Sequence, residues 1–119
     1  MNDFKVMAKI LSAVKQCELA RNMQTELFDV KVLKTDESTR DSLIIKLQKE
    51  GYIDGFFIVD DIDNQTYPVI MWNASLPSIT IKGMTFIEEN KPLRKAIDAL
   101  KNTVLGSAAE KVTKGLFLL

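Results

Sequence analysis

The side chains that could take part in chemistry are few, and the most suggestive are three neighbouring aspartates. Asp60, Asp61 and Asp63 lie in one polar stretch, with Asp61 and Asp63 at alternate positions, as carboxylate ligands of calcium often are. The stretch lacks the following glycine and the distal glutamate of an EF-hand loop. We therefore favour a solvated turn over a metal site, and we expect no cofactor.

Nucleophilic and acid–base catalysis lack their usual residues. The chain has one cysteine, Cys17, and no histidine, so it has neither an internal disulfide nor a histidine-activated nucleophile. It also has no phosphate-cradling glycine loop. We expect a protein that is not an enzyme, with Cys17 as a small helix residue.

Length and charge set further limits. The 119 residues suit one domain, and an apolar content of 46% is enough for a core without a metal or disulfide. Sixteen basic residues balance sixteen acidic ones, which argues against a general DNA coat or an anionic-membrane binder. No apolar run is long enough to span a bilayer, and we expect a cytoplasmic protein.

The elements that would position these residues begin with a helix. Apolar residues at helical spacing predict an amphipathic helix over residues 3–19. The segment 27–33 is ambiguous, because Asp29 could cap a short helix while Val30 and Val32 also suit a strand. We favour the short helix.

A third helix is predicted over residues 38–50. Ser38 with Asp41 resembles a capping box, and Gly51 stands where a left-handed cap would end the helix. Leu43, Ile44 and Leu47 would form its core face.

A hairpin should follow. Its strands are predicted over residues 52–59 and 67–72, with the second at a sheet edge or beginning after Pro68, which cannot donate a backbone hydrogen bond. Tyr67, Met71 and Trp72 are most simply core and sheet residues. An exposed tryptophan would instead indicate a partner surface.

Two helices complete the predicted domain. Thr80 is a candidate N-cap for residues 81–90, with Phe86 and Ile87 facing inward, and Pro92 opens a helix over residues 93–105. Residues 106–119 form a C-terminal extension, which could be helical and packs on the domain or on a dimer partner. We favour a dimer, because the chain ends in four apolar residues, Leu116, Phe117, Leu118 and Leu119.

This order of elements predicts an α+β fold. A helix that ends at a glycine and leads into a hairpin, which a threonine-capped helix follows, has the connectivity of a winged helix-turn-helix domain. We assign residues 1–105 to such a domain, with a two- to three-stranded antiparallel wing and additional C-terminal helices.

The same landmarks resemble the YjcQ-like family of small winged-helix proteins from bacteria and their phages and prophages. The resemblance lies in residues 4–11, 47–53, 77–83 and 86–90, whose order and spacing are more specific than any one of them. It implies the fold and a mobile-element origin, and it transfers no catalytic residues.

In a winged helix the helix over residues 38–50 is the candidate recognition helix. Lys46, Lys49 and Arg40 could meet phosphates, whereas Asp41 would repel them and Ile45 is apolar where a reading helix usually carries hydrogen-bonding groups. The candidate interaction face consists of Asp41, Ser42, Ile45, Lys46, Gln48 and Lys49. An ordinary solvated helix face is an equally good interpretation.

The predicted wing disfavours DNA. It carries Asp60, Asp61 and Asp63, and no lysine or arginine lies between Phe56 and Lys82, so a phosphate backbone would be repelled. We therefore predict a non-enzymatic phage or prophage accessory or regulatory module that binds a protein partner. The alternative is a DNA-binding transcriptional regulator that reads with helix 38–50, since a dimer could gather basic contacts from two half-sites.

Overall fold

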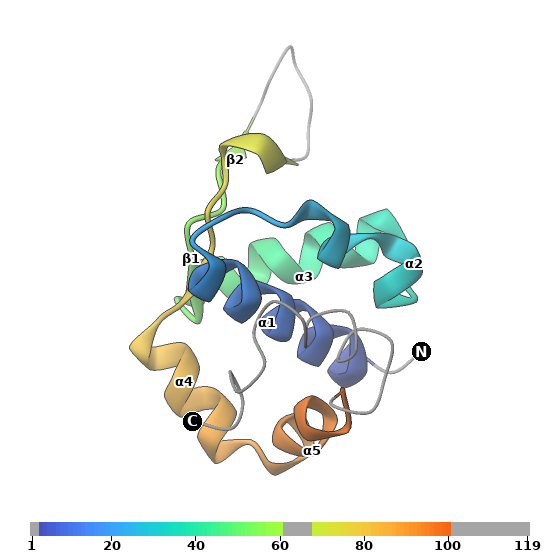
Figure 1. Cartoon of the computed structure of the whole chain (residues 1–119), viewed down its shortest axis with the longest axis vertical. Coiled ribbons are helices and arrows are strands. Elements are labelled where there is room, and N and C mark those ends of the chain that lie inside the picture. The colour runs from blue at the N-terminus through green and yellow to red at the C-terminus, as the bar shows by residue number, and fades with distance from the viewer. Residues whose placement is uncertain (1–2, 61–67, 101–119) are drawn as a thin grey trace.

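The computed structural model describes residues 3–60 and 68–100. Within them it contains five α-helices and two small antiparallel sheets of two strands each, so the protein has an α+β fold. Figure 1 shows helix α1 (Asp3–Ala20) running through the middle of the helices. Strand β2 (Ile58–Val59) lies at one end of the long axis, and helices α4 (Ile81–Glu89) and α5 (Lys91–Ala99) lie at the other.

Helix α1 confirms the predicted first helix and is more deeply buried than an amphipathic pattern requires. Other elements cover it on several sides, and its small residues Ala8, Ala13 and Cys17 are fully buried. Burial raises the pKa of the Cys17 thiol. Its Sγ accepts a hydrogen bond from the Gln24 N–H at 3.3 Å. Cys17 is thus a buried residue of α1, and the prediction of a small helix residue is confirmed.

The ambiguous segment is helical. A 3₁₀ turn, η1 (Thr25–Phe28), leads into the short helix α2 (Val30–Leu33). The Asp29 carboxylate caps α2 by accepting the Lys31 N–H at 2.8 Å. The preference for a short helix capped by Asp29 is confirmed.

Helix α3 (Glu37–Lys49) begins one residue earlier than predicted. The cap is Asp36, whose carboxylate accepts the Thr39 N–H at 2.6 Å, so the capping box of Ser38 and Asp41 is wrong. This hydrogen bond lowers the pKa of Asp36. Asp36 can act as the cap because its backbone is extended, which is the geometry an N-cap needs.

Gly51 ends α3 as predicted. Its φ is +83°, its N–H donates to the Gln48 carbonyl, and the Tyr52 N–H donates to the Leu47 carbonyl. These two bonds make a Schellman motif, which favours glycine at this position. The chain is thereby turned directly into the first strand.

The single predicted hairpin is two paired segments in the structure. Strand β1 (Ile53–Asp54) pairs with β4 (Ser78–Ile79), and β2 pairs with β3 (Val69–Ile70). Pairing of residues 52–59 with 67–72 is therefore right for β2 and wrong for β1. The interruption lies at Gly55, where φ is +99°. As predicted, the second strand begins after Pro68.

The returning chain is longer than the outgoing one, and a 3₁₀ turn takes up the excess. This turn, η3 (Trp72–Ala74), separates β3 from β4. The buried Ser75 hydroxyl bridges the gap in the ladder, because it accepts the Phe57 N–H and donates to the Met71 carbonyl, both at 2.9 Å. Turn η3 brings the Trp72 ring against the rings of Phe28 and Phe56.

Helix α4 follows the prediction, whereas α5 begins at Lys91, two residues before the predicted start. Thr80 caps α4 by accepting the Gly83 N–H at 2.9 Å, and Asn90 caps α5 by accepting the Leu93 N–H at 3.1 Å. Helix α5 packs on α1 through its buried residues Leu93 and Ile97. The part of the predicted final helix beyond Leu100 lies outside the described residues.

Candidate functional site

The candidate interaction face of α3 is only partly available. Three of its six residues are exposed, namely Ser42, Lys46 and Lys49, and the other three are half-buried, namely Asp41, Ile45 and Gln48. Ile45 packs against the core, so its predicted outward orientation is wrong. The segment that follows α3 folds back beside the helix and covers part of this face at Gln48.

The side-chain amide of Gln48 makes its hydrogen bonds within the fold. It donates to the Phe56 carbonyl and accepts the Phe56 N–H, both at 2.9 Å. The amide thus pairs with the backbone of Phe56 as a neighbouring strand would. Gln48 is the expected residue type for reading a base edge, yet both of its hydrogen-bonding atoms are occupied.

Replacing Gln48 by alanine should destabilise the protein by about 2 kcal/mol, because two backbone groups of the buried Phe56 lose their partners. Urea unfolding measures the loss. The exposed neighbour Lys49 provides the matched control, since Lys49→Ala should stay within about 0.5 kcal/mol of wild type. Equal effects of the two substitutions would show that the pairing has no energetic role.

Arg40 is also occupied within the fold and was wrongly placed among the phosphate contacts. Its Nε donates to Asp41 at 2.9 Å, and an Nη atom donates to the Phe28 carbonyl at 3.2 Å. The guanidinium carbon lies 4.8 Å from the centre of the Trp72 ring, and the side chain is only 13% exposed. Arg40 therefore joins α3 to η1 and to the returning chain.

Besides Arg40, the basic side chains of α3 and of α4 are lysines. Lys46 and Lys49 are exposed on α3. Lys82, in the first turn of α4, donates from Nζ to the Glu50 carbonyl at 2.7 Å and lies 5.2 Å from the centre of the Tyr52 ring. Of the three predicted phosphate contacts, Lys46 and Lys49 remain for a phosphate backbone.

An apolar surface lies on the paired strands β2 and β3. Phe57 and Met71 are opposite each other, since the Met71 N–H donates to the Phe57 carbonyl at 2.8 Å in the register of the β2–β3 ladder. Phe57 is 54% exposed and Met71 42%, whereas the alternate residues Phe56 and Ile70 are buried. Because side chains alternate between the faces of a strand, one face is turned to solvent. We call it the outer hairpin face; it comprises Phe57, Val59, Val69 and Met71.

The predicted core residues of the hairpin therefore differ in their exposure to solvent. Trp72 is half-buried and touches the aromatic core, as predicted. Met71 is exposed, so its assignment to the core is wrong. The direction of each side chain follows from the β2–β3 register, which the sequence left open.

Several predicted site residues lie outside the described part of the chain. Of the three aspartates, Asp60 is exposed at the end of β2, while Asp61 and Asp63 are not described. The same holds for Tyr67 and for the predicted self-association residues, which are Leu116, Phe117, Leu118 and Leu119. Within residues 3–60 and 68–100 no three His, Cys, Asp or Glu side chains are grouped so as to hold a metal ion. The homodimer stays a prediction.

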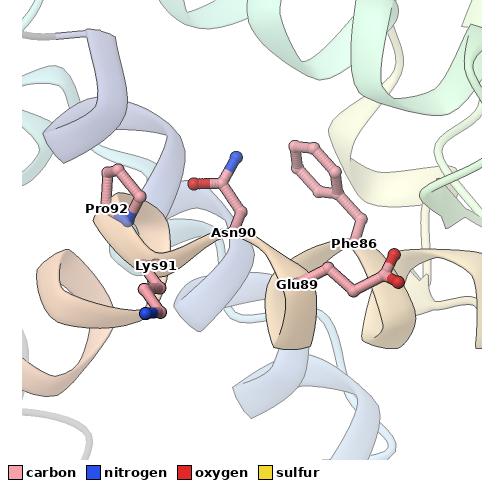
Figure 2. Close-up of a pocket in the computed structure, with 5 residues that line it drawn as sticks. All are labelled: Phe86, Glu89, Asn90, Lys91 and Pro92. Atoms are coloured by element: carbon pink, nitrogen blue, oxygen red, sulfur yellow. The ribbon is translucent and has the colours of Figure 1, made fainter.

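A depression of about 450 Å³ lies where α4 meets α5. Its lining consists of Phe86, Glu89, Asn90, Lys91 and Pro92. Figure 2 shows that the charged ends of Glu89 and Lys91 point away from each other, and Asn90 is occupied as the cap of α5. The Phe86 ring stacks on Tyr52 with centroids 4.2 Å apart. The polar groups do not converge on a common point, as a small-molecule site would require.

The fold and these surfaces define a small α+β protein. A family model described as YjcQ protein matches residues 8–104, and the chain therefore belongs to the YjcQ protein family. This confirms the resemblance found in the sequence. Comparisons with curated proteins and with solved structures found no match. No helix in the described residues is long and apolar enough to cross a membrane.

Proposed function

We propose that this protein is a non-enzymatic winged-helix module that binds a protein partner through the outer hairpin face. An accessory or regulatory role in a phage or prophage is part of the proposal, and it rests on the family resemblance. The winged-helix assignment is supported by the succession of α1, the α2–α3 pair and an antiparallel hairpin that starts directly after α3.

The observation that carries the proposal is the paired exposure of Phe57 and Met71. An aromatic ring and a methionine side by side in solvent represent apolar area whose burial is favourable by about 25 cal/mol per Å². Both residue types are enriched in the centres of protein interfaces. The absence of lysine and arginine from residues 57–81 argues against a phosphate backbone as the occupant.

DNA binding by α3 is the second candidate, and exposed Lys46 and Lys49 support it. Two phosphate contacts per protomer correspond to a slope of about −2 in a plot of log affinity against log salt concentration. Specific readers combine such contacts with hydrogen bonds to base edges. On α3 the side chain best suited to that task, Gln48, is occupied by Phe56.

Fluorescence anisotropy with labelled mixed-sequence duplexes at low salt separates the two candidates. We expect no saturable binding by wild type and no difference in the double variant Lys46→Glu/Lys49→Glu. The double variant Lys91→Glu/Lys95→Glu on α5 makes the same charge change at exposed positions and is the control. Salt-sensitive binding that only the α3 variant loses would overturn the preference for a protein partner.

A further inference from the structure

At the base of the hairpin, where β1 pairs with β4, side chains from helices cover both outer edges. The Gln48 amide occupies the backbone N–H and C=O of Phe56. On the other edge the Glu18 carboxylate, from α1, accepts the Ile79 N–H at 2.9 Å. Unpaired strand edges bind other strands readily, and proteins commonly cover them. Both edges of the base are thus covered at these positions.

The edge of β2 further along the hairpin differs. The Met71 N–H donates to the Phe57 carbonyl, while the Phe57 N–H donates to the Ser75 hydroxyl, so both backbone groups of Phe57 point toward the returning chain. Ile58 and Ile70 are next in the register and form a non-hydrogen-bonded pair of the ladder. The backbone N–H and C=O of Ile58 consequently point away from β3. Among the described residues, no hydrogen bond reaches them from another element. Ile58 therefore offers one donor and one acceptor at an edge that no other element within residues 3–60 and 68–100 hydrogen-bonds.

The opposite edge of the hairpin is a poorer site for another strand. Ile70 points its backbone groups outward there, but Pro68, the next outward position, has no N–H to donate. On the β2 edge the next outward position is Asp60, which has both backbone groups and an exposed side chain. The β2 edge is therefore the edge that a further strand would join.

The neighbouring side chains indicate the chemistry of such a strand. It would extend the outer hairpin face, so its own alternate side chains would lie beside Phe57 and Val59 and should be apolar. Asp60 is exposed at the end of β2, and residues 57–81 contain no lysine or arginine. A basic residue next to Asp60 would complement this charge.

We propose that the edge of β2 at Ile58 accepts a short extended segment of a protein partner, apolar at alternate positions and carrying a lysine or arginine beside Asp60. This inference rests on the proposed function and specifies how the hairpin binds. The added strand would be short, because Gln48 covers the edge at Phe56. Strand addition of this kind derives affinity from backbone hydrogen bonds and specificity from alternate side chains.

The test uses the full-length ¹⁵N-labelled chain and a blocked hexapeptide of alternating valine and lysine as the probe. We expect chemical-shift changes centred on residues 57–60 and exchange of the Ile58 amide proton slowed by about tenfold. Two N-methylated versions of the peptide then test which of its backbone N–H groups are needed for binding. Methylation of one alternate set of amides should abolish binding, while methylation of the other set should leave affinity within about twofold, because alternate N–H groups of a strand point to opposite edges.

The predicted charge preference is tested by reversing the charge in the probe and, separately, in the protein. Replacing lysine by glutamate in the probe should weaken binding by about tenfold, and Asp60→Lys should reverse that preference. The control Asp98→Lys, at an exposed position of α5, should leave it unchanged. Equal effects of the two methylation patterns, absence of binding by any probe at millimolar concentration, or shifts centred on α3 would each overturn the inference. Photo-crosslinking of a protein to position 57 would then still support the proposed function, so the two fail separately.

Discussion

Replacing Gly83 by alanine is expected to destabilise the protein by about 3 kcal/mol or more, a large overpacking effect. Gly83 is buried in the first turn of α4, where an added Cβ would lie 2.0 Å from the Tyr52 carbonyl oxygen and 2.9 Å from an Ile79 methyl carbon. The oxygen belongs to the backbone, so α4 would have to move away from β1. Alanine is the better helix former by about 1 kcal/mol, so the expected sign opposes helix propensity.

Gly51→Ala is the matched control for this prediction. Gly51 has a φ of +83°, but an added Cβ would meet only the flexible Lys82 side chain, at 3.7 Å. Its cost should be about 1 kcal/mol, the strain of a left-handed alanine. Urea unfolding of both variants gives the comparison. If Gly83→Ala proved no more damaging than Gly51→Ala, the close approach of α4 to Tyr52 would be wrong.

Arg40→Ala should be the second most damaging of the proposed changes, at about 2–3 kcal/mol. The substitution leaves the Asp41 carboxylate without its ion pair, removes one hydrogen bond from the Phe28 carbonyl, and takes the cation from the face of Trp72. At 13% exposure the side chain is poorly screened by solvent. Thermal or urea unfolding measures the loss, and Trp72 fluorescence reports the rearrangement around the indole.

A second arginine in an ion pair serves as the control. Arg94 lies 3.4 Å from Glu88, and the two side chains are 51% and 74% exposed. Exposed pairs of this kind contribute about 0–1 kcal/mol, so Arg94→Ala should have little effect. A loss at Arg40 as small as that at Arg94 would contradict the role of Arg40 in joining α3 to the hairpin.

Local signals predicted the elements well. Asp29 and Thr80 cap helices, and Gly51 ends one, because each depends on a side chain or φ angle within a few residues of the chain. The helical spacing of the apolar residues in α5 is equally local, and two of them, Leu93 and Ile97, are buried. The family resemblance combined such landmarks in order, and it is confirmed.

The candidate site was harder to predict, because its residues depend on partners far along the chain. Helical spacing placed Gln48 and Ile45 on the outward face of α3, but the Gln48 amide pairs with the backbone of Phe56 and Ile45 packs against the core. The interrupted hairpin depends on Gly55 and on the hydroxyl of Ser75, which stands in for a ladder hydrogen bond. Helical periodicity carries no information about such contacts. The exposure of Met71 likewise depends on the register between β2 and β3. A shift of one residue would turn each side chain to the opposite face, and the sequence alone did not fix that register.

Site-specific photo-crosslinking is the most direct test of protein binding by the outer hairpin face. A photoreactive phenylalanine analogue is placed at Phe57, at Lys49 on α3, or at exposed Lys95 on α5 as control. The full-length variants are irradiated in cells of the organism that carries the gene. If the outer hairpin face binds a protein, position 57 yields a discrete protein adduct and position 95 yields none. A DNA adduct from position 49, with no protein adduct from position 57, would contradict that role.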